Sequence, residues 1–533
     1  MYRAITIGAL AVLLVSPGAL AAESEPAPPP QQLSSLDISY ARTDIEGESI
    51  AVDLDTIIQS TLENNFDIRI EQINVPISIY GIEQEKAEFD PTFSAIASYE
   101  RSLTQAATDL EGADMPEAKE SELDLSLRQK IATGAQYGLT YENTRLRTNN
   151  QYVPLNPRYD VALKADITQP LLRDCGIDIN SATIRQAENS IMMAEQEYRR
   201  QVIDALAGAI NTYWELIFNI MDLRVRQAAL RQAEQLRDEN RARFRAGTIP
   251  RTDVLQAEAS VATRMTDIVI IRAQIETIED QLKRHMNLPA KLGEHVWDLP
   301  LDPKTAPDIT DFTPDTKGSL ELARDFRPDY RRFLLELKNR NIELDYRRNQ
   351  MWPSLNLHIA GRLAGIGGKP RPGAAVDEDA AGSYGAAFSN ATSGDYYSFE
   401  IGATLEIPLG NRLRRSAYRT AVLHLEQTHL RFERLKQDIT VEIRNAVRAL
   451  QTARAEINAT DIERRAQWRK LEAERQRFEA GQVTSFEVLT FQEEFAIAQR
   501  RYIRSIIGYN QAFVNLQRIQ GTLLEHLHIV LEY

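Results

Sequence analysis

Apolar residues recur at seven-residue intervals through two long stretches of the chain that contain no proline. The first stretch runs from about Asn180 to Ala246 and the second from Leu413 to Ala480. Each carries more than one row, such as Ile203, Ile210 and Ile217 in the first. This spacing predicts coiled-coil helices, and several rows on one helix predict several neighbours. At 1.5 Å per residue each helix would reach about 100 Å, too long for a globular core.

Shorter helical stretches accompany the long ones. They are expected at 55–89, 253–287, 319–351 and 486–524. The helices at 55–89 and 253–287 contain together about as many residues as one long helix, and so do those at 319–351 and 486–524. Two short helices stacked end to end would therefore flank one long helix along its length. On the helices alone, a coiled-coil rod or filament is the default interpretation.

Strict alternation of apolar and polar residues replaces the helical pattern in two regions. It predicts strands within about 92–169, and again at about 354–365 and 396–407. Each strand would have one apolar face and one polar or charged face. A small periplasmic sheet would give the same alternation, so the strands alone do not decide between a soluble and a membrane protein.

The connections between these strands are unequal in length. At one end they are long and rich in small or polar residues (104–120, 146–158 and 366–395), whereas the turn at 130–134 at the other end is short. Short turns on one side and long loops on the other are typical of outer-membrane barrels. One chain supplies about six strands at most, and membrane barrels begin at eight. The sequence therefore predicts a barrel wall shared between several chains.

The chain contains two copies of one unit. RFRAGTIPRTDVL at 243–255 returns as RFEAGQVTSFEVL at 477–489, an offset of 234 residues. We interpret 51–289 and 319–525 as the two copies, joined by a proline-rich linker at 290–318. Gly247 and Gly481 are expected to end the long helices in left-handed turns, so each phrase predicts the tip of a helical hairpin.

The two ends of the chain have their own patterns. Residues 1–22 combine Arg3, a short apolar run and small residues before a cut, which predicts a secretory signal peptide. Residues 23–50 are proline-rich and are expected to form a disordered leader. The tail at 526–533 alternates at Leu527, Ile529, Leu531 and Tyr533. This alternation predicts one short terminal strand beside the linker.

Composition and short motifs exclude several classes of partner and of functional site. The formal net charge of −14 argues against nucleic acid as a partner, and the single cysteine, Cys175, excludes a disulfide framework. The sequence contains none of the short motifs of hydrolases, metalloproteases or phosphate-binding loops. His424 and His429 are five residues apart and do not share a helix face. We expect no enzyme activity, no metal site and no cofactor.

Several segments together resemble the TolC family of outer-membrane efflux proteins. They are QPLLRDCG (169–176), AGTIPRTDVLQAEA (246–259), SLELARDFRPDY (319–330) and AGQVTSFEVL (480–489). The resemblance implies a mainly α fold with a membrane β-barrel portion, in which a homotrimer shares one barrel in outer-membrane lipid and a long periplasmic helical tunnel. It also implies a periplasmic adaptor and an inner-membrane pump, either an antiporter or an ABC transporter, in tripartite efflux or type I secretion. The alternative is a periplasmic or secreted coiled-coil structural protein.

One departure from the family's four strands per chain is an extra pair of segments, 121–129 and 134–145. If this hairpin joins the wall, a trimer would have about 18 strands and a wider pore.

The resemblance also implies site residues at the hairpin tips. Acidic residues just past the tip line the family's constriction, and the matching positions are Asp253 and Glu487. Both also suit a first helical turn, with Thr484 and Glu487 fitting a capping box. Thr490 replaces a second acid of the family motif, and Val483 replaces a basic residue that can hold the tip closed. The turn residues expected to contact the adaptor are Gly247, Thr248, Ile249, Gly481, Gln482 and Val483.

Overall fold

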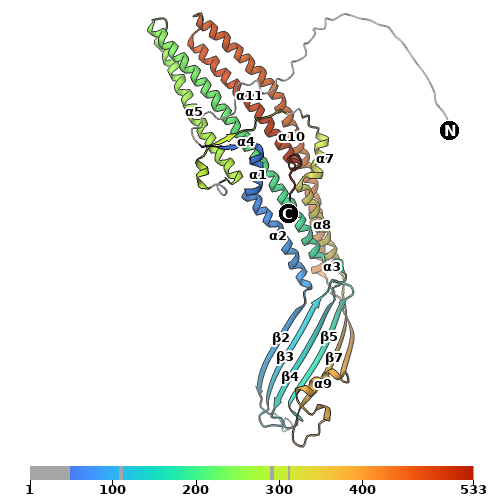
Figure 1. Cartoon of the computed structure of the whole chain (residues 1–533). Coiled ribbons are helices and arrows are strands. Elements are labelled where there is room, and N and C mark those ends of the chain that lie inside the picture. The colour runs from blue at the N-terminus through green and yellow to red at the C-terminus, as the bar shows by residue number, and fades with distance from the viewer. Residues whose placement is uncertain (1–47, 107, 109–111, 289–292, 310–311, 532–533) are drawn as a thin grey trace, which may run out of the picture. The chain divides into compact units, whose positions relative to one another are not determined.

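Two very long helices dominate the computed structural model, which describes residues 48–106, 108, 112–288, 293–309 and 312–531 (Figure 1). Helix α4 spans Ala182–Arg245, 64 residues, and α10 spans Arg412–Glu479, 68 residues. Both predicted long helices are therefore confirmed, to within two residues at each end. The predicted signal peptide and all but the last three residues of the predicted leader lie outside the described residues.

The other elements follow the order helices, strands, helices in each half of the chain. In the first half they are β1 (Ile50–Val52), α1 (Leu54–Asn64), α2 (Phe66–Lys86), η2 (Ala87–Phe89), β2 (Thr92–Leu103), β3 (Glu117–Lys130), β4 (Gln136–Thr148), β5 (Leu155–Pro170), α3 (Ile177–Asn180) and α5 (Arg251–Met286). In the second half they are η4 (Glu294–Asp298), β6 (Leu301–Pro303), α7 (Thr316–Phe326), α8 (Pro328–Asn349), β7 (Ser354–Pro370), η5 (Glu378–Ala380), α9 (Tyr384–Ser393), β8 (Tyr397–Glu406), α11 (Ser485–Gln520) and α12 (Leu523–His526).

Two of the predicted short helices are broken, which corrects the expectation of unbroken helices at 55–89 and 319–351. The first break is at Asn65, whose side chain caps α2 by accepting hydrogen bonds from the backbone of Asp67 and Ile68. The second is at Arg327, immediately before Pro328. A residue that precedes proline avoids the helical conformation, and Asn favours the N-cap position. The two breaks are equivalent in the repeat, because Arg327 lies 262 residues after Asn65 and the same offset relates Asp67 to Asp329 and Pro91 to Pro353.

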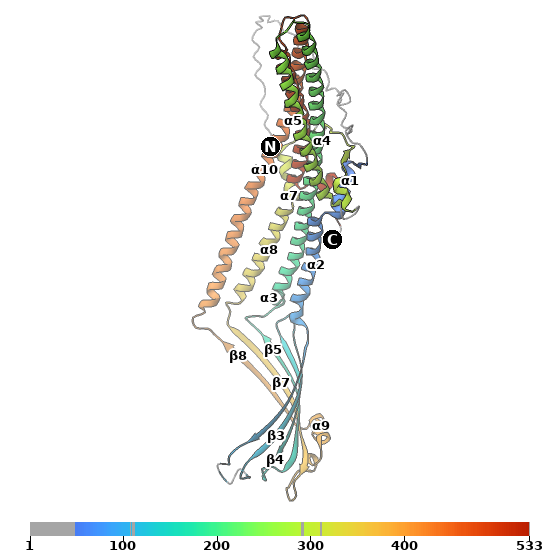
Figure 2. The ribbon, with the colours of Figure 1, turned by 90° about the vertical axis from the view of Figure 1, so that its left-hand side faces the viewer.

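The long helices have different surroundings. Helix α4 contacts α2, α5, α8 and α11 and buries a row of large apolar side chains that includes Leu206, Leu216 and Leu223. Helix α10 contacts α7, α8 and α11, and in Figure 2 its lower part runs along one side of the helical layer. The several heptad rows predicted for each helix thus serve several neighbours inside the chain.

The linker between the halves folds back onto α5. Strand β6 pairs in parallel with β1. Buried Lys283 donates from Nζ to the Trp297 carbonyl at 2.7 Å, and the Thr305 backbone N–H donates to the Tyr213 hydroxyl at 2.9 Å. These contacts anchor the linker to the middle of the helical bundle.

The remaining strands form one antiparallel sheet in the order β2-β3-β4-β5-β7-β8. The extra hairpin β3–β4 lies within this sheet, so each chain contributes six strands rather than four. Strand β5 from the first repeat pairs with β7 from the second, which joins the two halves. The sheet's helix-side connection at 131–135 is short, whereas the far end carries long connections at 104–116 and at 371–396, which includes α9 (Figure 1). The predicted long connection at 146–158 is wrong, because β4 and β5 extend into it and leave only 149–154 between them.

The tail after α12 forms no strand within residues 527–531, so the predicted terminal strand is wrong. The apolar residues of that alternation follow one helical turn, and Ile529 donates its backbone N–H to the Leu524 carbonyl as that turn closes. None of the helices in the described part of the chain combines the length and the apolar character needed to cross a bilayer.

Candidate functional site

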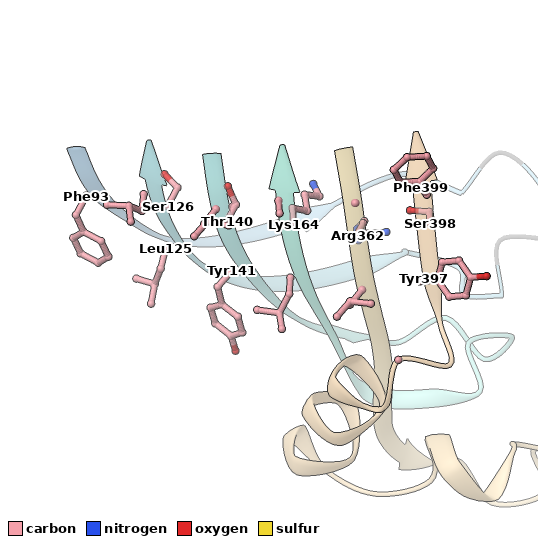
Figure 3. A pocket seen from close by; sticks show the side chains of 17 residues that line it. Phe93, Leu125, Ser126, Thr140, Tyr141, Lys164, Arg362, Tyr397, Ser398 and Phe399 are labelled. Carbon is pink, nitrogen blue, oxygen red and sulfur yellow. The ribbon is translucent and has the colours of Figure 1, made fainter. Parts of the chain in front are cut away.

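The six-stranded sheet has two chemically different faces. The strand register aligns Leu125, Tyr141 and Leu163 across neighbouring strands, and in Figure 3 Leu125 and Tyr141 point to one side. The next register row aligns Ser126, Thr140 and Lys164, whose side chains point to the other side. The alternation predicted from the sequence therefore produces an apolar face and a polar face over the whole sheet. A sheet of this kind can separate lipid from water.

Both edges of the sheet are open. Strands β2 and β8 each pair with one neighbour only, and their side chains are exposed on both faces. Phe93 on β2 and Phe399 on β8 are each about two-thirds exposed. Long unpaired strand edges attract further strands, and folded proteins normally cover them. The two edges are therefore candidates for pairing with another copy of the chain.

Apolar stripes continue these edges onto the helices. Helix α2, which precedes β2, exposes Ile70, Ile73, Ile77 and Tyr80. Their spacing of three, four and three residues is that of a coiled-coil seam. Helix α10, which follows β8, exposes Leu423 and Leu430, seven residues apart. We call these two stripes the α2 seam and the α10 seam.

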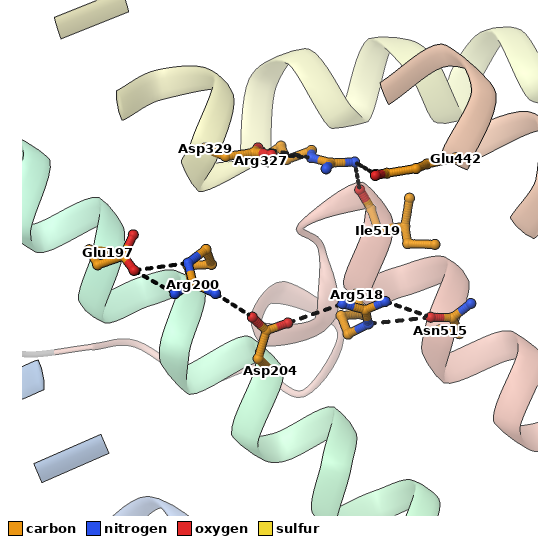
Figure 4. A network of polar contacts seen from close by, with 9 residues as sticks. All are labelled: Glu197, Arg200, Asp204, Arg327, Asp329, Glu442, Asn515, Arg518 and Ile519. Carbon is orange, nitrogen blue, oxygen red and sulfur yellow. Dashed lines mark hydrogen bonds and ion pairs between the residues drawn. The ribbon is translucent and has the colours of Figure 1, made fainter. Parts of the chain in front are cut away.

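Charged residues join the helices inside the chain near the break between α7 and α8 (Figure 4). Arg200 of α4 donates to Glu197 and to Asp204, and Arg518 of α11 donates to Asp204 at 3.2 Å. Hydrogen bonds from Arg200 hold the pKa of Glu197 below its usual range. Beside this network Arg327 bridges Asp329 of α8 and Glu442 of α10. The two networks fix α4 to α11 and α8 to α10.

A second charged cluster lies between the two helical hairpins, closer to the tips. Asp222 of α4 is 1% exposed and pairs with Arg226 at 3.1 Å and with Arg500 of α11 at 2.5 Å. Arg264 of α5 pairs with Glu493 of α11 at 3.2 Å. Sequence reasoning missed this cluster. A charged residue among the buried apolar positions of α4 is the signal that could have indicated it.

The hairpin tips confirm the predicted left-handed glycines. Gly247 has φ +76° and Gly481 has φ +72°. In the first tip the backbone N–H groups of Gly247 and Thr248 donate to the carbonyls of Phe244 and Arg243, and the second tip repeats this pair of bonds. This is the Schellman arrangement that closes a helix C-terminus.

The two tips also pack against each other. Leu236 of α4 lies in one apolar cluster with Phe478, Val488 and Leu489 of the second repeat, and Val483 packs against it. The Arg243 guanidinium lies 4.2 Å from the centre of the Phe478 ring. Of the six turn residues singled out above, Gly247, Thr248, Gly481 and Gln482 are exposed, whereas Ile249 and Val483 are partly buried.

Asp253 and Glu487 lie in the first turns of α5 and α11. The predicted capping box at Thr484 is wrong, since the Thr484 side chain makes no capping hydrogen bond and Glu487 is exposed. Thr484 occupies the N-cap position in an extended conformation, but its hydroxyl does not reach the backbone donors of the first turn. Within the described residues the structure gives neither carboxylate an ion-pair partner; Glu487 is exposed and Asp253 is partly buried.

Metal chemistry has no visible site in the described segments. Nowhere in them do three or more His, Cys, Asp or Glu side chains gather closely enough to hold a metal ion.

An amphipathic six-stranded wall with open edges, joined to a long helical bundle, defines a class of protein: a subunit of a membrane channel. Its fold is that of solved outer-membrane channels. The CmeC outer-membrane channel of Campylobacter jejuni matches with a TM-score of 0.65 at 16% identity, over 94% of each chain. The outer-membrane protein VceC of Vibrio cholerae matches with a TM-score of 0.61 at 16% identity, over 88% of this chain and 96% of that one.

The open state of the MtrE outer-membrane channel of Neisseria gonorrhoeae matches with a TM-score of 0.60 at 17% identity, over 91% of this chain and 95% of that one. No curated protein sequence matches the chain. The family model described as outer membrane efflux protein matches residues 176–288 and 320–522, which is more than half of the chain.

The chain belongs to the outer membrane efflux protein family. It is an outer-membrane channel protein with strands in a membrane β-barrel and a long helical part in the periplasm, and its family is one of channels rather than enzymes. The sequence prediction of a TolC-like efflux channel is confirmed, and the coiled-coil structural protein is not favoured.

Proposed function

We propose that three copies of the chain close into one conduit that carries substrates out of the cell in a tripartite efflux or type I secretion system. The observation that carries this proposal is the coincidence of open strand edges with apolar seams. The α2 seam precedes the β2 edge, and the α10 seam follows the β8 edge. One neighbour-to-neighbour contact therefore covers strand edge and helix seam together. Three chains give a wall of about 18 strands, well above the minimum for a membrane barrel.

The polar face of the sheet then lines the lumen and the apolar face meets lipid, as in other water-filled barrels. The helices continue the lumen into the periplasm, and transport through it is passive. The exposed tips at Thr248 and Gln482 are the contact for a periplasmic adaptor, which connects the conduit to an inner-membrane pump. Asp253 and Glu487, just past the tips, line the constriction.

The seam is tested by placing charge on it. Replacing Ile73 and Ile77 of the α2 seam with Lys would put six like charges per trimer into an apolar contact, where unpaired charge is strongly unfavourable. We expect the heat-modifiable trimer of the outer-membrane fraction to be lost on gels. Gln72→Lys is the matched control, because Gln72 is exposed on the same helix but lies off the seam.

The competing interpretation predicts a different result. If the wild-type chain were released by osmotic shock as a water-soluble monomer, the conduit would be ruled out and a periplasmic structural protein favoured. A Lys double variant that kept its trimers would remove the α2 seam from the contact.

Adaptor docking is tested separately. A photoreactive residue at Thr248 or Gln482 is expected to cross-link the adaptor in cells. The same residue at Thr277, exposed on α5 away from the tip, is the control. Equal capture from all three positions would remove the tips as the docking site.

A further inference from the structure

The apolar face of the sheet contains a groove of about 660 Å³ that extends across the strands, from Phe93 near the helix-side end of β2 to Tyr397 at the far end of β8 (Figure 3). Leucine and aromatic side chains from all six strands of the sheet contribute most of its lining. They are Phe93, Leu125, Tyr141, Leu163, Leu363 and Tyr397. The volume is in the range of sites that bind small ligands, and the lining chemistry suits a hydrocarbon.

Helix α9 closes the far end of this groove. It lies on β5 and β7, with Ala387 and Ala391 buried against Val161 on the apolar face, and Gly394 at its end lines the groove. Glycine at 365 makes this approach possible. A Cβ atom there would lie 2.1 Å from the carbonyl oxygen of Ala387. The helix therefore packs its backbone directly onto the strand.

Specific bonds hold α9 in place. The Ser383 side chain caps its N-terminus by accepting from the Gly385 backbone. Asn390 donates from Nδ2 to the carbonyls of Ile366 and Asp379 at 3.1 and 2.7 Å. The Tyr384 hydroxyl is hydrogen-bonded to the Tyr141 hydroxyl at the border of the groove. These hydrogen bonds hold the connection between β7 and β8 against the sheet.

The exposed chemistry of α9 suits the boundary between lipid chains and head groups. Its ten residues include no charged side chain, and Tyr384 and Phe388 are about 40% exposed. Aromatic side chains gather at that boundary in membrane proteins, and in barrels they border the apolar band. From Gly394 at the end of this helix the groove crosses the sheet, and it takes its apolar lining from one or two positions on each of the six strands.

We propose that the groove binds an acyl chain of a lipid in the outer leaflet, with α9 at the level of the head group. The inference rests on the proposed function, because it requires the sheet to stand in the outer membrane with its apolar face towards lipid. Edge pairing between copies would use the backbone groups of β2 and β8 and leave this face uncovered. Lipid is then the neighbour that fills it.

The test uses the full-length trimer in vesicles of phosphatidylethanolamine and phosphatidylglycerol. A small fraction of the phosphatidylethanolamine carries a diazirine on an acyl chain, and light-induced adducts are mapped to peptides. We expect adducts to concentrate on the groove residues of β4, β5 and β7 relative to the apolar face near the helices, around Leu405.

Two glycines provide a matched pair of variants. Gly361 lines the groove and has open space where a side chain would stand, so Gly361→Leu fills the groove without touching α9. Gly402 has the same open space on the polar face, opposite His358. Gly361→Leu is expected to lower groove labelling about tenfold, the effect of losing one well-buried apolar contact. Gly402→Leu is expected to leave it unchanged.

The outcomes separate this inference from the proposed function. Labelling spread evenly over the apolar face and unaffected by Gly361→Leu would overturn the groove alone. Cross-links that joined α9 of one chain to another chain would overturn it as well, since a protein would then occupy the site. Strands without any lipid adduct would contradict both the groove and the conduit. Persistence of heat-modifiable trimers in both Leu variants shows that they have folded.

Discussion

The two repeats share one plan but occupy different environments. Of the 64 residues of α4, 24 are buried, against 12 of the 68 residues of α10. The tips are nearly identical, with the same glycine turn and the same pair of backbone bonds. The strands differ, because the first repeat supplies β2 to β5 and the second only β7 and β8.

This difference shows how two copies of one unit can occupy two different environments. The long helix of the first repeat, α4, lies inside the helical bundle and contacts helices of both repeats, including α1, α2, α5, α8 and α11. The other copy lies at the edge and keeps apolar side chains such as Leu423 and Leu430 exposed. The same heptad spacing thus serves internal packing in α4 and, in our proposal, contact with the next chain in α10.

The largest expected effect is on stability, and it should distinguish a buried leucine of α4 from an exposed leucine of α10. Leu216 of α4 is fully buried, whereas Leu423 of α10 is 62% exposed. Leu216→Ala should lower the free energy of unfolding by about 2–5 kcal/mol, because it leaves a cavity in a packed core. Denaturant unfolding followed by the helical signal measures this.

Leu423→Ala is the comparison. It should change helical unfolding by under about 0.5 kcal/mol, as surface substitutions do, but lower the temperature at which trimers dissociate on gels. Equal effects of the two substitutions on helical unfolding would contradict the distinction between core and seam.

The tips should respond alike in both repeats. Gly247→Ala and Gly481→Ala each place a Cβ in a left-handed turn with open space around it, so backbone strain is the only cost. We expect each substitution to destabilise the chain by about 1–2 kcal/mol. Gly508→Ala, in α11 with open space and an ordinary helical backbone, should instead stabilise by about 0.5–1 kcal/mol. A clearly larger effect at one tip would show that the tips are not structurally equivalent.

The pH dependence of folding stability should differ between equivalent positions of the two repeats. Burial lowers the pKa of His285 in the folded chain below its usual value of 6.5, and the nearby charge of Arg284 adds to this. The unfolded chain therefore binds a proton more readily. This contribution to stability is fully present above about pH 6.5 and is lost as the pH falls towards the lower folded pKa.

The equivalent position in the second repeat is Ile519, 234 residues later. His285→Ile should remove its part of the loss of stability below about pH 6.5, measured as the difference between the pH profiles of variant and wild type. An unchanged profile would mean that His285 titrates normally in the folded chain.

The smallest expected effect concerns ion selectivity at the tips. Asp253→Ala with Glu487→Ala removes six carboxylates per proposed trimer, and rings of acidic side chains favour cations in pores. Anion permeability in a planar bilayer should rise, with conductance otherwise similar. Thr277→Ala, distant from the tip on α5, is the control. Selectivity that did not change would place both carboxylates outside the constriction.

Much of the fold follows from periodicity. The heptads of α4 and α10 and the alternation of the six strands each continue over many residues, and the tip glycines occupy positions where few other residues fit. The failed predictions rest on short patterns. The alternation from Leu527 onward is only a few residues long, and the described part of it closes α12 instead of forming a strand. Thr484 has the right chemistry for a cap without the required geometry.

Helix α9 illustrates what sequence periodicity cannot supply. Apart from Tyr384 and Phe388 its residues are small or polar, and both Gly385 and Thr392 are weak helix formers. The helix forms because Gly365 of β7, about 20 residues earlier, lets its backbone rest on the strand. The ion pair between Asp222 and Arg500 is also invisible to sequence periodicity, because it depends on how the two helical hairpins pack against each other. Contacts between distant segments decide both cases.

The most direct test of the shared wall is amide hydrogen exchange of the membrane-embedded protein. In a single chain, β2 and β8 each lack a partner on one side, whereas β4 is paired on both. If copies pair edge to edge, the amides of Thr92–Leu103 and Tyr397–Glu406 should be protected as strongly as those of β4. Rapid exchange confined to β2 and β8, with β4 protected, would contradict a barrel closed between chains.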